Sequence, residues 1–121
     1  MDILNVLEKA TQINSVSGSE NEIRKFISDN VKKYCDELLV DAMGNLIAHK
    51  KGSGKKIMFA AHMDEIGIIV TDIDDKGFVR FSSVGGLNLR NLVNLRVRFA
   101  NGVEGVIGAE EESFKDKPAI S

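Results

Sequence analysis

Three features that the sequence has little of exclude several classes of protein. Cys35 is the only cysteine, so the chain cannot form an internal disulfide, which is typical of a reducing compartment. Pro118 is the only proline, which argues against a proline-rich linker. No apolar run is long enough to span a bilayer, and no apolar segment flanked by basic residues opens the chain. We therefore predict a cytoplasmic protein with no membrane association.

An excess of basic charge is also missing. The chain has 16 Lys and Arg against 18 Asp and Glu, a formal net charge of −2. Because a dedicated nucleic-acid-binding domain is usually basic, we expect no nucleic-acid partner. The length of 121 residues, with 43% hydrophobic and 28% charged residues, fits one ordinary globular domain.

The first part of the sequence predicts two helices. Apolar residues at helical spacing predict a helix over residues 3–13. Ser19 with Glu22 three residues later forms a capping box, which predicts the start of a second helix that runs to about Tyr34. Arg24 belongs to the basic residues that we expect on the solvent face of this helix.

Three short strands are predicted next. Residues 37–40 and 45–49 flank a turn, and residues 57–61 (Ile-Met-Phe-Ala-Ala) follow a glycine-rich turn. The last run is apolar on both faces, which predicts a central strand covered on both sides. Two helices followed by three strands, the last of them central, indicate the opening of an α/β sandwich.

After about Glu65 the pattern changes to alternating strands with tight turns, as in an antiparallel sheet. Asn101-Gly102 predicts a type I′ hairpin turn between residues 95–99 and 103–107. Gly85-Gly86 predicts a sharp bend or a close backbone approach. We expect part of a small barrel or sandwich in this half.

The strongest candidate site follows the predicted central strand directly. His62 and Asp64 are two residues apart, so in an extended segment they share a face, whereas Glu65 points to the opposite side. Neutral imidazole is a common zinc ligand, and a carboxylate on its other ring nitrogen fixes the tautomer. Two interpretations stay open: a metal ligand with its orienting acid, or a capped strand end with a His–Asp hydrogen bond and no metal.

Other polar residues are better explained by structure. His49 lies in an alternating strand beside lysines and is expected to be exposed rather than a ligand. Asp72, Asp74 and Asp75 crowd a predicted hairpin tip, and residues 110–112 are a run of glutamates typical of a solvated surface. Since a catalytic zinc needs about three protein ligands, His62 and Asp64 cannot complete a site alone.

Several motifs, in this order, resemble one enzyme family. They are Ser17-Gly18-Ser19-Glu20, Asp41-Ala42-Met43-Gly44-Asn45, Ala60-Ala61-His62-Met63-Asp64-Glu65-Ile66-Gly67, Val84-Gly85-Gly86 and Gly105-Val106-Ile107-Gly108. The chain resembles the N-terminal part of the glutamyl aminopeptidase family, which is also called deblocking aminopeptidase and cellulase M.

This resemblance implies an α/β fold, the start of a zinc-peptidase-like α/β/α sandwich followed by part of an inserted antiparallel β-barrel-like domain. Residues 1–65 would be the N-terminal part of the catalytic domain, and residues 66–121 the first part of the β domain, which serves oligomerisation and substrate access. It also implies two divalent metal ions, zinc or cobalt, with His62 as the first metal ligand and Asp64 as the catalytic-site acid that orients it.

The resemblance further implies peptide substrates and homo-oligomers, dimers that assemble into tetrahedral dodecamers. The family's remaining ligands and catalytic Glu lie downstream of the part matched here, so we expect an N-terminal fragment with at most a partial metal site and no peptidase activity alone. Two alternatives are a non-catalytic module that self-associates through its β domain, and an endoglucanase. The second needs two carboxyl groups facing each other across a sugar, and Asp64 and Glu65 should diverge.

Overall fold

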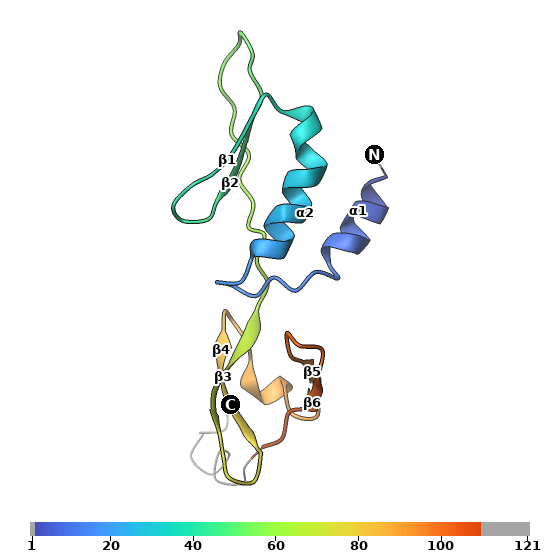
Figure 1. Ribbon diagram of the computed structural model, residues 1–121, viewed down its shortest axis with the longest axis vertical. Coiled ribbons are helices and arrows are strands. Elements are labelled where there is room, and N and C mark those ends of the chain that lie inside the picture. The colour runs from blue at the N-terminus through green and yellow to red at the C-terminus, as the bar shows by residue number, and fades with distance from the viewer. Residues whose placement is uncertain (1, 110–121) are drawn as a thin grey trace, which may run out of the picture. The chain divides into compact units, whose positions relative to one another are not determined.

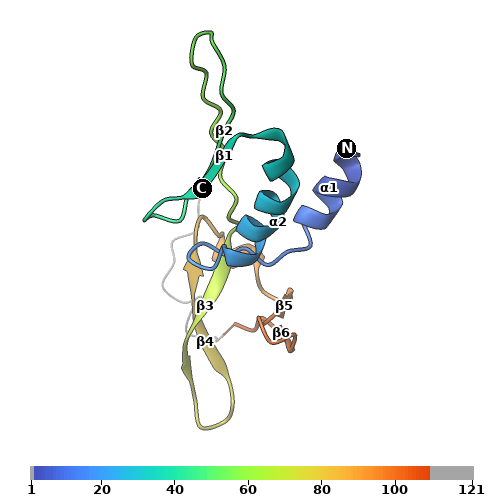
Figure 2. The same cartoon turned by 45° about the horizontal axis from the view of Figure 1, so that its top comes forward.

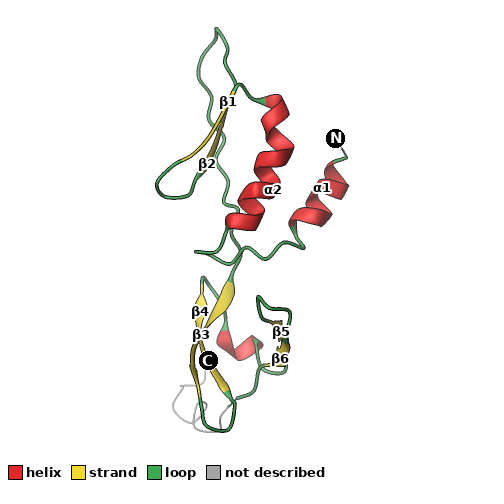
Figure 3. Cartoon of the chain, in the orientation of Figure 1, coloured by secondary structure: helices red, strands yellow, loops and turns green. Residues whose placement is uncertain are grey.

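The computed structural model describes residues 2–109, and the chain divides into two compact units, Met1–Gly85 and Gly86–Ser121 (Figure 1). In these residues the first unit holds two helices and two hairpins, and the second holds a short 3₁₀ helix and a hairpin (Figure 3). Helices and strands thus occur together, in agreement with the predicted α/β class. None of the described helices is long and apolar enough to cross a bilayer.

Helix α1, Ile3–Ala10, begins where the sequence supplies an acceptor for its first amides. The Asp2 carboxylate accepts hydrogen bonds from two first-turn amides, at 3.1 and 3.4 Å. The helix ends earlier than the predicted range of residues 3–13. The amides of Gln12 and Ile13 donate to carbonyls three residues back rather than four, which tightens the chain out of the α-helix.

Helix α2, Asn21–Val31, continues into the 3₁₀ helix η1, Lys32–Tyr34, so the predicted end of this helix is confirmed. The predicted capping box is wrong. The Ser19 amide donates to a carbonyl of the preceding turn at 2.8 Å, and the helix begins after Glu20, whose side chain forms no cap. Ile23 anchors α2 in the first unit, because its side chain is buried.

Strands β1, Glu37–Val40, and β2, Leu46–His49, form an antiparallel hairpin. In its loop the Gly44 amide donates to the Asp41 carbonyl at 3.0 Å, and Gly44 adopts a left-handed φ of 85°. One oxygen of the Asp41 carboxylate accepts hydrogen bonds from two further loop amides, each at 2.9 Å. The loop therefore satisfies its own backbone donors and fixes the register of the hairpin.

The same type of loop closes the other two described hairpins. Strand β3, Gly67–Ile73, pairs with β4, Val79–Val84, and strand β5, Arg96–Arg98, pairs with β6, Glu104–Val106. In each loop a glycine with φ near 85° donates its amide to the carbonyl three residues earlier, at 2.9 Å in the first and 2.8 Å in the second. These are three-residue loops with a left-handed final glycine.

The predicted type I′ turn at Asn101-Gly102 is therefore wrong, although the hairpin itself is present. A type I′ turn needs a positive φ at both central residues, and here Gly102 has one (86°) and Asn101 does not. The Asn101 side chain instead accepts a hydrogen bond from the Val103 amide at 3.0 Å. That bond favours the longer loop over the two-residue turn.

Arg24 does not face water as predicted. Its Nε atom donates to the Gly44 carbonyl at 2.7 Å, and its Nη1 atom donates to the Asn21 side chain at 2.7 Å. The arginine thus joins α2 to the loop between β1 and β2. An added Cβ at Gly44 would lie 2.9 Å from the Nη2 atom of Arg24 and would displace the end of this side chain, and the left-handed φ of 85° itself favours glycine.

Residues 57–61 do not form the predicted buried central strand. They belong to no ladder within the described residues and are drawn as loop in Figure 3. The side chains of Ile57, Met58 and Phe59 are 78%, 86% and 94% exposed. A central strand needs neighbours on both edges and layers on both faces, and residues 2–109 supply neither. The apolar pattern indicated burial without identifying what would cover it.

A parallel bridge between Val16 and Glu65 attaches the segment that joins the two helices to the residues before β3. The Glu65 amide donates to the Ser15 carbonyl at 2.9 Å, and the Ser17 amide donates to the Glu65 carbonyl at 3.4 Å. The Glu65 carboxylate also accepts a hydrogen bond from the Ser15 amide at 3.0 Å. Ser15 is buried at this junction.

Two glycines let the backbone approach closely around this bridge. A Cβ added to Gly67 would lie 2.5 Å from a methyl carbon of Val16. At Gly85, where φ is 80°, it would lie 2.8 Å from a methyl carbon of Ile66, so the close approach predicted there is confirmed. Within the first unit, the contact at Gly67 therefore packs the β3–β4 hairpin against the segment that joins the two helices. The domain boundary near Glu65 stays a prediction about the complete fold.

The second unit is described by itself. The 3₁₀ helix η2, Leu89–Asn91, precedes β5, and the side chain of Ile107 after β6 is buried. The Ile107 amide donates to the Leu95 carbonyl at 3.0 Å, and its carbonyl accepts from the Asn94 amide at 2.8 Å. These bonds extend the β5–β6 pairing to Ile107, the one apolar side chain that the unit buries within the described residues.

We predict that Gly67→Ala destabilises the chain by about 1–3 kcal/mol, because the new methyl group overpacks against Val16. Urea unfolding measures this loss of free energy, and the double variant Val16→Ala/Gly67→Ala should recover most of it. Gly52→Ala is the matched control, since nothing lies within 4 Å of its added Cβ. Equal stability of Gly67→Ala and Gly52→Ala would contradict the prediction.

Candidate functional site

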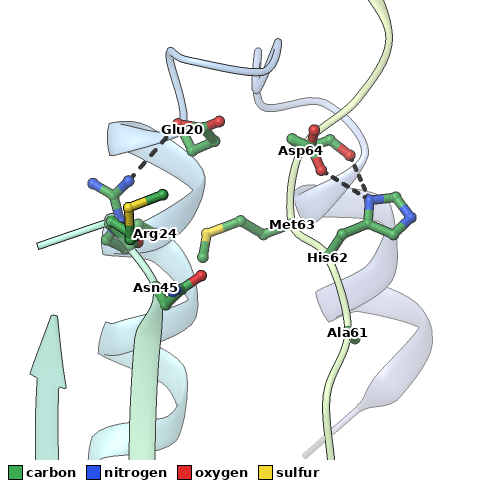
Figure 4. A pocket seen from close by; sticks show the side chains of 9 residues that line it. Glu20, Arg24, Asn45, Ala61, His62, Met63 and Asp64 are labelled. Carbon is green, nitrogen blue, oxygen red and sulfur yellow. Dashed lines mark hydrogen bonds and ion pairs between the residues drawn. The ribbon is translucent and has the colours of Figure 1, made fainter. Parts of the chain in front are cut away.

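His62, Met63 and Asp64 lie on the extended segment that leads into β3. His62 and Asp64 project to one side, and Met63 projects to the other, toward Arg24 and Asn45 (Figure 4). This is the alternation expected of an extended backbone. The structure therefore brings the two predicted site residues together.

The His62 ring is oriented by Asp64. Its Nδ1 atom lies 3.0 Å from an Asp64 carboxylate oxygen and 2.9 Å from the Asp64 carbonyl oxygen. Both partners only accept hydrogen bonds when the acid is ionised, so Nδ1 carries the proton in the neutral ring. The lone pair is then on Nε2, which has no hydrogen-bond partner within residues 2–109. The His62 side chain is 86% exposed, so this nitrogen is available to a ligand.

The Asp64 carboxylate is held from both sides. The Ser17 hydroxyl donates to one oxygen, and the His62 ring donates to the other. The Ser17 hydrogen bond, followed by the one from His62, holds the pKa of Asp64 below its ordinary value. Asp64 therefore remains ionised at neutral pH and keeps its acceptor role toward the ring.

Asp64 and Glu65 accept hydrogen bonds from different neighbours. The Asp64 carboxylate is bonded to Ser17 and His62, whereas the Glu65 carboxylate accepts from the Ser15 amide. The two acids consequently do not form a facing pair with a shared space between them.

A cavity of about 250 Å³ lies beside this segment, and Figure 4 shows its lining. Its other wall comes from the start of α2 and from the β1–β2 loop. At the start of α2, the Arg24 guanidinium lies 3.8 Å from the Glu20 carboxylate. The lining residues are Glu20, Arg24, Met43, Gly44, Asn45, Ala61, His62, Met63 and Asp64.

Sequence reasoning missed Ser17, Arg24 and Asn45 as neighbours of the candidate site. Ser17 and Asn45 stood in motifs that carried the family resemblance, but nothing in their local spacing linked them to Asp64 or Met63. The helical stripe predicts Arg24 on the solvent side, because it does not reveal which loop packs over the polar side of the helix.

Few side chains that can bind a metal ion lie near His62 within the described residues. Within the part of the chain that the structure describes, no three side chains of His, Cys, Asp or Glu come together. His62 with Asp64 fits one ligand and its orienting acid, and does not by itself complete a metal site.

The other polar candidates lie elsewhere. His49 is an exposed residue of β2, as predicted, and its ring lies 3.2 Å from the Glu37 carboxylate. Asp74 accepts hydrogen bonds from two amides of the β3–β4 loop, in agreement with a structural hairpin tip. The glutamates at 110–112 lie outside the described residues.

Comparison with known proteins identifies the family. The profile described as M42 glutamyl aminopeptidase matches residues 44–119, which is more than half of the chain. The chain belongs to the M42 glutamyl aminopeptidase family. The match includes His62 and Asp64, and it confirms the resemblance that the motifs indicated.

Members of the M42 family and their relatives match nearly the whole chain. A putative aminopeptidase of Acetivibrio thermocellus is 56% identical over 111 residues, covering 92% of this chain and 34% of its own length. An endoglucanase-named structure from Thermotoga maritima is 40% identical with a TM-score of 0.79, covering 86% of this chain and 34% of its own. The TET1 peptidase of Pyrococcus horikoshii is 38% identical with a TM-score of 0.75, and the match covers 99% of this chain and 37% of that peptidase. The chain thus spans about a third of the length of the proteins it matches, and its fold agrees with the M42 fold.

Asp41 and Asn45 provide a test of the loop that borders the cavity. The Asn45 side-chain amide donates to Asp41 Oδ2 at 2.8 Å, and this bond is the largest cause that lowers the pKa of Asp41. We predict that Asn45→Ala raises the pKa of Asp41 toward its ordinary value. Carbon-13 NMR titration of the Asp41 carboxyl measures the change.

The lowered pKa of Asp41 makes the free energy of unfolding depend on pH. Because the folded-state pKa of Asp41 is lowered, its ionised form stabilises the loop above the unfolded-state pKa. That contribution is lost as the pH falls through the lower folded-state pKa, and it is smaller in Asn45→Ala. Asn101→Ala, in the loop of the second unit, is the control. An Asp41 pKa that is the same in Asn45→Ala and in the unsubstituted chain would show that the amide has no such role.

Proposed function

We propose that the chain contributes a metal ligand, His62, and its orienting acid, Asp64, to a metal-dependent aminopeptidase that releases N-terminal residues from peptides. One observation carries this proposal: the hydrogen bond between His62 Nδ1 and the Asp64 carboxylate, which leaves the Nε2 lone pair unused. Membership of the M42 family supplies the reaction class. The aminopeptidase names of the relatives agree with it.

The proposed cofactor is a pair of divalent ions, zinc or cobalt. When bound, such a pair polarises a peptide carbonyl and acidifies water. The residues of this chain have simpler tasks. His62 offers a neutral nitrogen, and Asp64 holds the proton on the opposite ring nitrogen, which raises the basicity of the ligand and fixes the plane of the ring.

Further ligands are needed, because a catalytic zinc uses about three protein ligands and residues 2–109 bring no such group together. We therefore propose that the 121-residue chain holds a partial site and is inactive alone. We further propose that residues 1–65 belong to the catalytic domain and residues 66–121 to an inserted β domain. A homo-oligomer is proposed as well, since the TET1 peptidase can assemble into a tetrahedron or a large octahedral shell.

A second candidate is a non-catalytic module that associates through its β half. The observation that favours it is the incomplete set of metal ligands within the described residues. Glycoside hydrolysis, which the endoglucanase name of one structural relative suggests, has less support in this chain than the other two candidates. Asp64 and Glu65 bond to different neighbours, whereas that reaction needs two carboxyl groups facing one sugar.

Metal binding separates the two candidates. We predict that Co²⁺ broadens the NMR signals of the His62 ring and its neighbours, and that His62→Ala abolishes this local effect. His49→Ala is a matched control, because His49 is also exposed and also paired with a carboxylate. Equal broadening in both variants, or none in the unsubstituted chain at millimolar Co²⁺, would favour the module over the ligand role.

We also predict that the 121-residue chain, loaded with Zn²⁺ or Co²⁺, releases no amino acid from peptides with free N-termini. The reason is that one imidazole cannot hold two metal ions and leave an open coordination position for water. Chromatography of the peptide products measures release. Metal-dependent release that His62→Ala removes would overturn the proposed incompleteness, and cleavage of cello-oligosaccharides without peptide cleavage would overturn the peptidase assignment.

A further inference from the structure

Ser17 lies far from Asp64 in the sequence but contacts it in the structure. Its hydroxyl donates a hydrogen bond to Asp64 Oδ2, the carboxylate oxygen that does not face His62. Ser17 belongs to the segment that bridges to Glu65, and its own amide donates to the Glu65 carbonyl at 3.4 Å. The backbone therefore delivers this hydroxyl to the acid independently of any contact that the side chain makes.

We propose that Ser17 is a positioning residue for the metal-ligand site: through Asp64 it holds the His62 ring in the tautomer that exposes the Nε2 lone pair. This inference rests on the proposed role of His62 as a ligand. It assigns a role to a residue whose side chain is linked to the imidazole through Asp64.

The physical argument concerns the rotation of the Asp64 carboxylate. The terminal torsion of an aspartate is broad, so a partly exposed carboxylate can turn about its axis at little cost. The Ser17 hydroxyl fixes one oxygen, and the other oxygen is then kept 3.0 Å from His62 Nδ1. Without the hydroxyl, the carboxylate can turn toward water, and Nδ1 keeps only the Asp64 carbonyl as an acceptor.

The bridge restrains Ser17 from both sides. Before it, the Ser15 carbonyl accepts from the Glu65 amide at 2.9 Å, and after it, the Ser19 amide donates to the Val16 carbonyl at 2.8 Å. The segment is therefore a short turn held at its base by β-type bonds. A hydroxyl on such a support loses little conformational freedom when it binds the acid, in contrast to a residue on a loose loop.

The experiment compares Ser17→Ala with Ser17→Thr, which keeps the hydroxyl at an exposed position, and with Ser19→Ala as a control in the same turn. Nitrogen-15 shifts of the His62 ring, measured without metal at one neutral pH, report the tautomer. NMR titration with zinc chloride reports the affinity. For Ser17→Ala we expect a larger share of the Nε2–H tautomer and about a 10-fold weaker affinity for zinc, the lower end of the range for residues that orient a metal ligand.

Ser17→Thr and Ser19→Ala should both match the unsubstituted chain. The inference is overturned if Ser17→Ala leaves the His62 shifts and the zinc affinity unchanged, or if Ser17→Thr behaves like Ser17→Ala. His62→Ala tests the underlying proposal separately. If His62→Ala binds zinc as the unsubstituted chain does, the ligand role fails, whereas the tautomer measurement still decides whether Ser17 positions the ring.

Discussion

The hydrogen bonds between residues 15–17 and Glu65 are the constraint on which the candidate site depends. They join the turn after α1 to the segment that carries His62 and Asp64 (Figure 2). The same junction brings Val16 against Gly67, where no larger residue fits, and places the Ser17 hydroxyl at Asp64. A few backbone bonds thus align a serine, an acid and an imidazole that come from two distant parts of the chain.

The features that could be predicted from the sequence are those that depend on near neighbours. Helical spacing gave α1 and α2, and period-two alternation gave the common face of His62 and Asp64. Glycine-containing turns gave all three described hairpins. Their details were less predictable, because local side chains compete: Asn101 bonds to Val103 and so favours a three-residue loop over a type I′ turn.

The features that could not be predicted depend on contacts between distant residues. The helical pattern predicts that Arg24 faces solvent. In the structure its Nε atom lies 2.7 Å from the Gly44 carbonyl oxygen, because the β1–β2 hairpin packs on α2. Ser17 gives no local sign that it will meet Asp64. For residues 57–61 the apolar pattern predicted burial, whereas the side chains of Ile57, Met58 and Phe59 are exposed. Burial depends on a covering layer that other parts of a fold supply, so the run alone could not predict it.

The exposed run at residues 57–61 has a consequence for the chain in solution. Its residues lack ladder partners within the described part, and no charge or proline interrupts them. Such a run offers a template to which a second chain can add edge to edge, as in ordered aggregates. Lys55 and Lys56 flank it as gatekeepers on one side only. Because salt screens those two charges, we expect association of copies through this run to increase with ionic strength.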